Sequence, residues 1–312
     1  MPWKQNYTAT DEISLSDDEV RWPDGHRCCL AVNVDLSLAR GPDGLRERDL
    51  RGPRAMFGLH EGLEQLLATL ARFNIKATFT VPAAMARLLG GTLRELMGEG
   101  HEIAAHGFKH EDVSSLDRAD EKARMDLSTE ILSEAIGQPP QGWYSLPRQG
   151  DPFAVGTISP NTMDLLIEAG YRYMGNGLSD DIPHYWVTDF EQRRAILTLP
   201  YFYHFDDQFF LLFPDKGTGL EHADTLFANW RAEFDAQYKR GRYFNMTLHP
   251  HAIGWCNRLK LLEDFLGYMR GYPGIWNPTG GQCASYWLQT YPAKTHLRLE
   301  DSIWRDYPGS LS

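Results

Sequence analysis

The feature that most constrains the fold of this chain is a regular alternation of short apolar runs with amphipathic segments. Runs at 27–35, 76–82 and 101–106 predict strands, and the leucine spacing within 60–74 fits a helical period of about 3.6 residues. The pattern continues with predicted strands at 141–146, 171–176, 194–203 and 242–250, and predicted helices at 118–137, 159–170, 222–240 and 258–271. Such alternation favours a parallel sheet. About seven units without a glycine-rich phosphate motif favour a distorted (β/α)7-type barrel over a dinucleotide-binding sheet.

The length of 312 residues fits one large domain with two distinct ends. Residues 1–25 lack apolar periodicity and carry the acidic run "SDDE", so we expect an N-terminal arm that wraps the domain or a neighbouring subunit. The barrel domain is expected over 26–290 and a C-terminal tail over 291–312. The glycine- and arginine-rich stretch 39–57 predicts a long loop.

The composition argues against nucleic acid and membrane partners. The 42 acidic and 31 basic residues give a net charge of −11, which repels phosphate backbones and anionic lipids. The chain has no long apolar run, and its first residues are polar rather than basic and then apolar, so we expect a cytoplasmic protein. The four cysteines lack C-x-x-C spacing and are expected to be reduced and structural.

Polar side chains stand where three predicted strands end, which is where barrels of this kind gather their chemistry. These residues are Asn33 and Asp35, His106 and His110, and His249 and His251. Gly107 lets the chain turn, so both imidazoles of the H-x3-H pair can converge on one centre while Asp35 adds an oxygen. The sequence therefore predicts a facial site for Zn²⁺ or another divalent transition metal, with Asp35, His106 and His110 as ligands. Such an ion leaves positions open for water and a substrate carbonyl.

The alternative for the same residues is purely structural. Strand-end histidines are often simple hydrogen-bonded groups, and Asp35 could instead form an ion pair with a loop arginine such as Arg40. An unpaired carboxylate inside a barrel costs several kcal/mol, which favours a cation as its partner.

Several motifs in order resemble the polysaccharide deacetylase superfamily, the nodulation-protein-B homology domain, over roughly residues 27–280. They are "AVNVD", "KATFTVP", "GHEIAAHGFKHED", "LIEAGYRYMGN" and "TLHP". Further motifs resemble the allantoinase-like and cyclic imide hydrolase-like branch: "GWYS", "SPNT", "DDIPHYW", "LTLPYFYHFDDQFF" and "TLHPHAIGWCNRLKLLEDFLGYMRGYPGIW". The resemblance implies a deacetylase-like barrel that hydrolyses non-peptide carbon–nitrogen bonds. It also implies a homo-oligomer, with a tetramer as one arrangement and "WRDYPGS" near the end as part of the interface.

Compared with metal-dependent members of that family, the chain keeps the ligands and changes the base. Asp35, His106 and His110 match the ligand positions, whereas Asn33 stands where those members have a catalytic aspartate. Allantoinase-like relatives also resemble the chain in this asparagine, but they lack the second histidine. Tyr144 stands in place of the arginine that metal-dependent members use to orient their base.

Proton handling therefore falls to other groups. Asn33 cannot take up a proton near neutral pH, so it would position water or donate a hydrogen bond to an oxyanion. His249 matches the family's general acid. Glu111, or its neighbour Asp112, could serve as base or orient a histidine, and the alternative is that each caps the helix that follows.

The remaining site predictions concern the pocket. Trp143, Tyr144 and Trp186 are expected as apolar walls, His251 and Trp255 at the mouth, and Arg148 beside the pocket or in a lid. The segment 180–186 predicts a rigid access loop or a solvated surface, and 204–210 a pocket or intersubunit segment.

Three functions follow from these observations. The first is a zinc-dependent hydrolase of a small amide, with a cyclic ureide or imide preferred. The second is an intracellular N-deacetylase of a sugar or another N-acetyl compound. The third is a catalytically inactive metal-binding homologue, because the aspartate base and its arginine are absent.

Overall fold

The computed structural model describes residues 15–145, 157–189, 192–202, 205–211 and 223–297. Its sheet contains strands β1 (Cys28–Asp35), β2 (Thr78–Val81), β3 (Glu102–Ala105), β4 (Gly142–Tyr144), β5 (Tyr173–Gly177), β6 (His184–Asp189), β7 (Arg194–Pro200), β8 (Tyr243–Leu248) and β9 (Ile275–Trp276). The strand order is β6-β7-β5-β4-β3-β2-β1-β8, with β9 beside β1. Every pairing is parallel except that of β6 with β7. This is the expected (β/α)7-type arrangement, in which the edge strands β6 and β8 do not pair with each other in the described residues.

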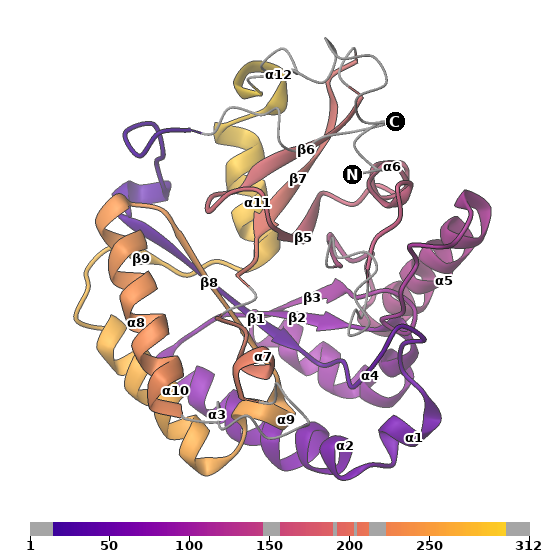
Figure 1. Cartoon of the computed structure of the whole chain (residues 1–312), viewed down its shortest axis with the longest axis horizontal. Helices are drawn as coiled ribbons and strands as arrows, with labels where there is room; N and C mark the ends of the chain where they lie inside the picture. The colour runs from indigo at the N-terminus through magenta and orange to yellow at the C-terminus, as the bar shows by residue number, and fades with distance from the viewer. Residues whose placement is uncertain (1–14, 146–156, 190–191, 203–204, 212–222, 298–312) are drawn as a thin grey trace.

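Helices connect the parallel strands and cover their outer side. The long ones are α3 (Leu63–Phe73), α4 (Ala83–Gly98), α5 (Arg118–Ile136), α8 (Ala223–Arg240), α10 (Cys256–Met269) and α11 (Gly280–Thr290). The short ones are η3 (Pro23–Gly25), α1 (Glu47–Leu50), α2 (Pro53–Phe57), η4 (Gly58–Gly62), α6 (Thr162–Glu168), α7 (Asp207–Leu211), α9 (Pro250–Ile253) and α12 (Ala293–His296). In Figure 1, α3, α4, α8 and α10 surround the central strands, and α11 stands beside β5 and β7.

Two clusters of buried apolar side chains hold these layers together. The larger lies between the strands and the outer helices and includes Phe79, Leu132, Trp230 and Phe265. The smaller joins β5–β7 and α11 to the described part of the N-terminal arm, where Trp22 packs against Trp287 with ring centroids 5.6 Å apart. Because Trp22 is buried, this end of the arm packs on the barrel.

Most expected elements are present, with three local corrections. The loop expected over 39–57 contains the short helices α1 and α2. The expected access loop 180–186 becomes strand β6 from His184 onward, because pairing with β7 extends it. The helix expected from residue 159 begins only at Thr162, and the Ser159 hydroxyl accepts from the backbone N–H of Asn161 at 2.8 Å.

Candidate metal centre

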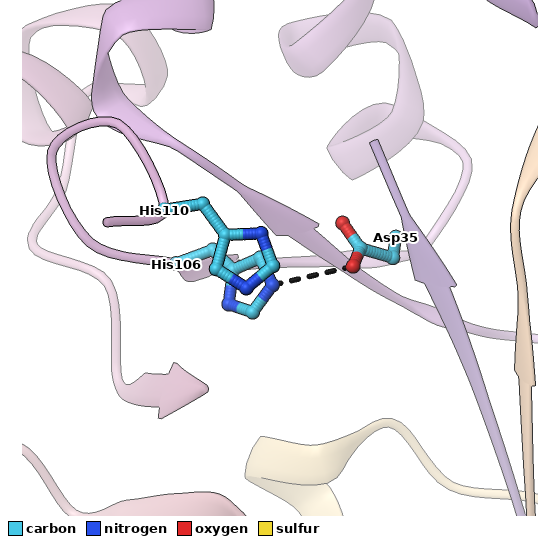
Figure 2. Close-up of side chains that lie close together, drawn as sticks. All are labelled: Asp35, His106 and His110. Carbon is cyan, nitrogen blue, oxygen red and sulfur yellow. Dashed lines mark hydrogen bonds and ion pairs between the residues drawn. The ribbon is translucent and has the colours of Figure 1, made fainter. Parts of the chain in front are cut away.

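The carboxyl ends of β1 and β3 bring the three expected ligands together. Asp35 is the last residue of β1, His106 directly follows β3, and His110 lies on the turn after it. Their ligand atoms all lie within 4.8 Å of one another, and all three side chains are buried. Figure 2 shows the two imidazoles stacked one above the other and facing the Asp35 carboxylate. The expected alternative of an Asp35–Arg40 ion pair is not formed in the described residues, since Asp35 contacts histidines instead.

Hydrogen bonding fixes which nitrogen of His106 faces the acid. Its Nδ1 lies 2.8 Å from the backbone carbonyl oxygen of Tyr144, which only accepts, so Nδ1 carries a proton. In the neutral ring, Nε2 then has a lone pair, and it lies 3.2 Å from Asp35 Oδ2. A lone pair facing a carboxylate oxygen is repulsive unless a cation or a proton lies between them.

His110 supplies a nitrogen without a hydrogen-bond partner. Its Nδ1 contacts the Ser37 hydroxyl at 2.7 Å, whereas its Nε2 is buried and has no hydrogen-bond partner among the described residues. Burial lowers the pKa of His110 well below its usual range, and the nearby His106 acts in the same direction. A neutral imidazole with a free, buried nitrogen is the form that binds a metal ion. The donor set therefore fits a divalent transition metal.

The turn that carries His110 is held by its surroundings. His110 itself has a left-handed backbone (φ 59°), which is costly for a residue with a side chain. Backbone bonds tie the turn to the loop after β1: Leu45 N–H donates to Lys109 at 2.7 Å, and Asp112 N–H to Pro42 at 2.8 Å. A Cβ on Gly44 would lie 2.6 Å from the Lys109 carbonyl oxygen, so this close approach needs glycine.

Glu111 and Asp112 contribute to this turn rather than to a helix cap. Glu111 is buried, and its oxygens accept from the backbone N–H of Lys109 at 2.6 Å and from Arg124 at 3.1 Å. Asp112 accepts from the backbone N–H of Ser114 at 2.8 Å. The cap of α5 is Asp117, so the expectation that Glu111 or Asp112 caps it is wrong. The contacts of Glu111 favour orienting the turn over acting as a base.

His249 stands beside the three ligands at the end of β8. Its Nε2 lies 3.3 Å from Asp35 Oδ2, and its Nδ1 donates to Asp207 Oδ1 at 2.7 Å. Burial alone would lower the pKa of His249, but the carboxylates of Asp206, Asp207 and Asp35 outweigh it and raise that pKa well above the usual range. The ring is therefore protonated and oriented, as a general acid requires.

Asp206, Asp207 and His249 form a second group with metal-ligand spacing. The proton that His249 Nδ1 donates to Asp207 occupies the nitrogen that a metal would need there. This group therefore suits proton transfer better than metal binding. The expectation for 204–210 left a pocket role and an intersubunit role open, and the contact of Asp207 with His249 favours the pocket role.

Comparisons with known proteins show what the chain resembles as a whole. The family model for polysaccharide deacetylases matches residues 52–174. The chain is 21% identical to the peptidoglycan deacetylase of Helicobacter pylori over 267 residues, which cover 77% of the chain and 88% of the relative. Residues 52–174 of the chain thus resemble the polysaccharide deacetylase family. These likenesses support a hydrolase that acts on carbon–nitrogen bonds.

Solved structures show the same fold for this chain. A polysaccharide deacetylase-type structure from Mycobacterium smegmatis has a TM-score of 0.76 and 26% identity, covering 93% of this chain and 99% of that one. An allantoinase has a TM-score of 0.75 and 23% identity, covering 90% and 95%. Within the described residues, none of the helices combines the length and the apolar character that crossing a membrane requires.

The other residues predicted for the site have different surroundings. Trp143 and Glu111 line a cavity of about 20 Å³ next to His106, which is room for about one water molecule. Tyr144 donates through its hydroxyl to Asn33 Oδ1 at 3.2 Å, so it is more than an apolar wall. Trp186 is buried in the larger apolar cluster. Arg148 lies outside the described residues.

His251 and Trp255, the two residues predicted at the mouth of the pocket, differ in their exposure. His251 is buried, with its ring centroid 5.5 Å from that of His249 and its Nε2 3.0 Å from Gln208 Oε1. Trp255 is half exposed and stacks on Phe57 at 4.0 Å. The partner of His249, Asp207, was not predicted from the sequence. The two adjacent acids Asp206 and Asp207 that follow a predicted strand could have indicated it.

Proposed function

We propose that the protein is a zinc-dependent hydrolase of a small amide, with a cyclic ureide or imide as the preferred substrate. The observation that carries the metal is the pair of imidazole nitrogens beside Asp35: His106 Nε2, which lies 3.2 Å from Asp35 Oδ2, and His110 Nε2, which has no partner in the described residues. A divalent ion held by these residues would polarise the substrate carbonyl and increase the acidity of a water molecule.

The protein's own residues account for the remaining steps. Water adds to the carbonyl carbon and releases one proton to solvent, the carbon–nitrogen bond breaks, and the departing nitrogen takes up one proton from the protein. His249 holds that proton on the nitrogen facing Asp35, while Asp207 keeps the ring in place from the other side. Asn33 offers an amide N–H to the developing oxyanion. Glu111 keeps the His110 turn in position.

The choice of substrate class depends on Asn33. Because an asparagine cannot act as base, the site suits amides with a good leaving nitrogen, and a ring imide or ureide has a better one than an acetamide. The likeness in fold to an allantoinase agrees with this choice. The likeness to a peptidoglycan deacetylase supports the second candidate, an N-deacetylase of a sugar or another N-acetyl compound.

A substrate panel tests the proposal. Hydantoins, ring imides, simple acetamides and N-acetyl sugars would be assayed with metal-stripped protein and with protein reloaded with zinc, nickel or cobalt. We expect turnover of ring substrates only after reloading, and loss of turnover in His106→Ala. Turnover of N-acetyl sugars alone would favour the second candidate. Metal binding without turnover of any compound would indicate an inactive homologue. The cytoplasmic location and the homo-oligomeric state stay predictions.

A further inference from the structure

A row of buried polar side chains leads from Asn33 away from the ligands and through the barrel interior. Tyr144 and Tyr173 are both buried, and their rings meet edge to face with centroids 6.0 Å apart. Glycines make room for them, since a Cβ on Gly175 would clash with the Tyr144 ring and one on Gly142 with the Tyr173 ring. Both hydroxyls converge on Gly280, where an added Cβ would lie 2.4 Å from Tyr173 Oη and 3.0 Å from Tyr144 Oη.

The far end of this row is a carboxylate that fixes the direction of the protons. Glu102 Oε1 accepts from Tyr173 Oη at 2.9 Å, and its Oε2 accepts from the backbone N–H of Gly281 at 2.6 Å. Because the Tyr173 hydroxyl donates to Glu102, its single proton is committed there. Tyr144 donates its single proton at the other end, to Asn33 Oδ1.

This donation decides how the Asn33 amide is turned. With Oδ1 occupied by Tyr144, the NH2 group points elsewhere, and the structure gives it no hydrogen-bond partner among the described residues. The neighbouring strand adds Thr247, opposite Asn33 in the β1–β8 register, whose buried hydroxyl also lacks a partner in the described part of the chain. An unpaired NH2 group and an unpaired buried hydroxyl beside the ligands are expected to receive a ligand or water.

We propose that Tyr144 is a positioning residue that holds the Asn33 amide with its NH2 turned toward the substrate oxygen. Glu102 and Tyr173 fix Tyr144 in turn. The inference depends on the proposed function, because it assigns Asn33 the role of oxyanion donor. It explains why a tyrosine follows the tryptophan of β4 at a site where a purely apolar wall would need only a phenylalanine.

A double-mutant cycle tests whether Tyr144 acts through Asn33. We expect Tyr144→Phe to lower kcat about 10-fold with KM nearly unchanged, because a donor to a developing oxyanion acts in the transition state. In an Asn33→Ala background the same change should alter kcat less than about twofold.

Tyr171→Phe is the matched control, since this buried tyrosine bonds to Thr129 at 2.7 Å, away from Asn33. Metal content is measured for every variant. Unchanged kcat in Tyr144→Phe, or an equal loss in the Asn33→Ala background, would overturn the inference.

A second measurement does not need turnover. In protein labelled with ¹⁵N at asparagine, the NH2 signals of Asn33 are assigned by their disappearance in Asn33→Ala. We expect Tyr144→Phe to shift or broaden those signals, and Tyr171→Phe to leave them in place. Unchanged signals in Tyr144→Phe would end the inference whatever the kinetics show. If the parent hydrolyses nothing in the panel while these signals respond as expected, the proposed function fails and the positioning of Asn33 stands.

Discussion

Asp35 and His249 show how single residues divide the chemistry of this site. Burial would raise the pKa of Asp35, but the adjoining His106 and His249 hold it well below its usual range. Asp35 is therefore ionised and available to a cation, while His249 keeps its proton. The division depends on Asp207, which lies 42 residues before His249 in sequence and contacts it only in the fold.

Replacing Asp207 tests this division. We expect Asp207→Asn to lower kcat about 10²-fold or more, because the His249 ring loses both its orientation and its carboxylate partner. KM should change little. Asp206→Asn is the comparison: Asp206 Oδ1 lies farther from His249 Nδ1, at 3.6 Å, and Asp206 also bonds to Tyr201, so its loss should lower the pKa of His249 but leave the ring oriented by Asp207, with a smaller loss of kcat. Steady-state kinetics of both variants provide the measurement, and equal losses in the two would contradict the assignment.

At the scale of elements, α5 is attached to the turn before α6 through a buried acid. Glu121 of α5 is buried and accepts from the hydroxyls of Ser159 and Thr162. Burial nevertheless raises the pKa of Glu121 above its usual value of 4.5. The folded protein thus holds this proton more tightly than the unfolded chain does.

The free energy of unfolding should therefore depend on pH through the protonation of Glu121. The stability that Glu121 contributes is fully present below pH 4.5 and is lost as the pH rises through the raised pKa of the folded state. Glu121→Gln cannot ionise, so the free energy of unfolding of the parent minus that of the variant should fall from pH 4.5 to pH 7. Urea unfolding at several pH values checks this. A difference that stays constant or rises with pH would show that burial does not dominate at Glu121.

The elements that sequence could predict are those with strong local patterns. The strands and helices from β1 to α5 follow apolar periodicity, and the αL cap Gly137 ends α5 as expected. β6 and α11 were not predicted, because β6 depends on pairing with β7 and α11 packs through Cys283 and Trp287 on the smaller cluster. Ligand residues were predictable from strand ends, whereas Asp207 and the Tyr144–Asn33 bond depend on contacts distant in sequence.

Across the whole molecule, side chains connect the segments that precede the two edge strands of the sheet, β6 and β8. Arg242 directly precedes β8, and Asp180 and Asp181 shortly precede β6. The Arg242 guanidinium pairs with both acids and with Asp17 of the N-terminal arm. Its side chain is only 7% exposed, so this ion network lies largely away from solvent.

Removing the central cation should weaken the whole fold. We expect Arg242→Met to lower the free energy of unfolding by about 3 kcal/mol, because partly buried carboxylates lose their partner. Arg240→Met is the control: its side chain is 43% exposed, and its loss should cost less than about 1 kcal/mol. Equal effects in chemical denaturation would show that the network does not join these strands.

The proposed function depends on one catalytic metal ion bound by Asp35, His106 and His110. Calorimetric titration of zinc into metal-stripped protein measures this binding, with His110→Ala and, as control, the exposed His60→Ala. We predict one ion per chain for the parent and the control, and affinity lower by about 10²-fold or more for His110→Ala. A parent that binds no stoichiometric zinc, or a His110→Ala variant that binds it as tightly, would contradict the account.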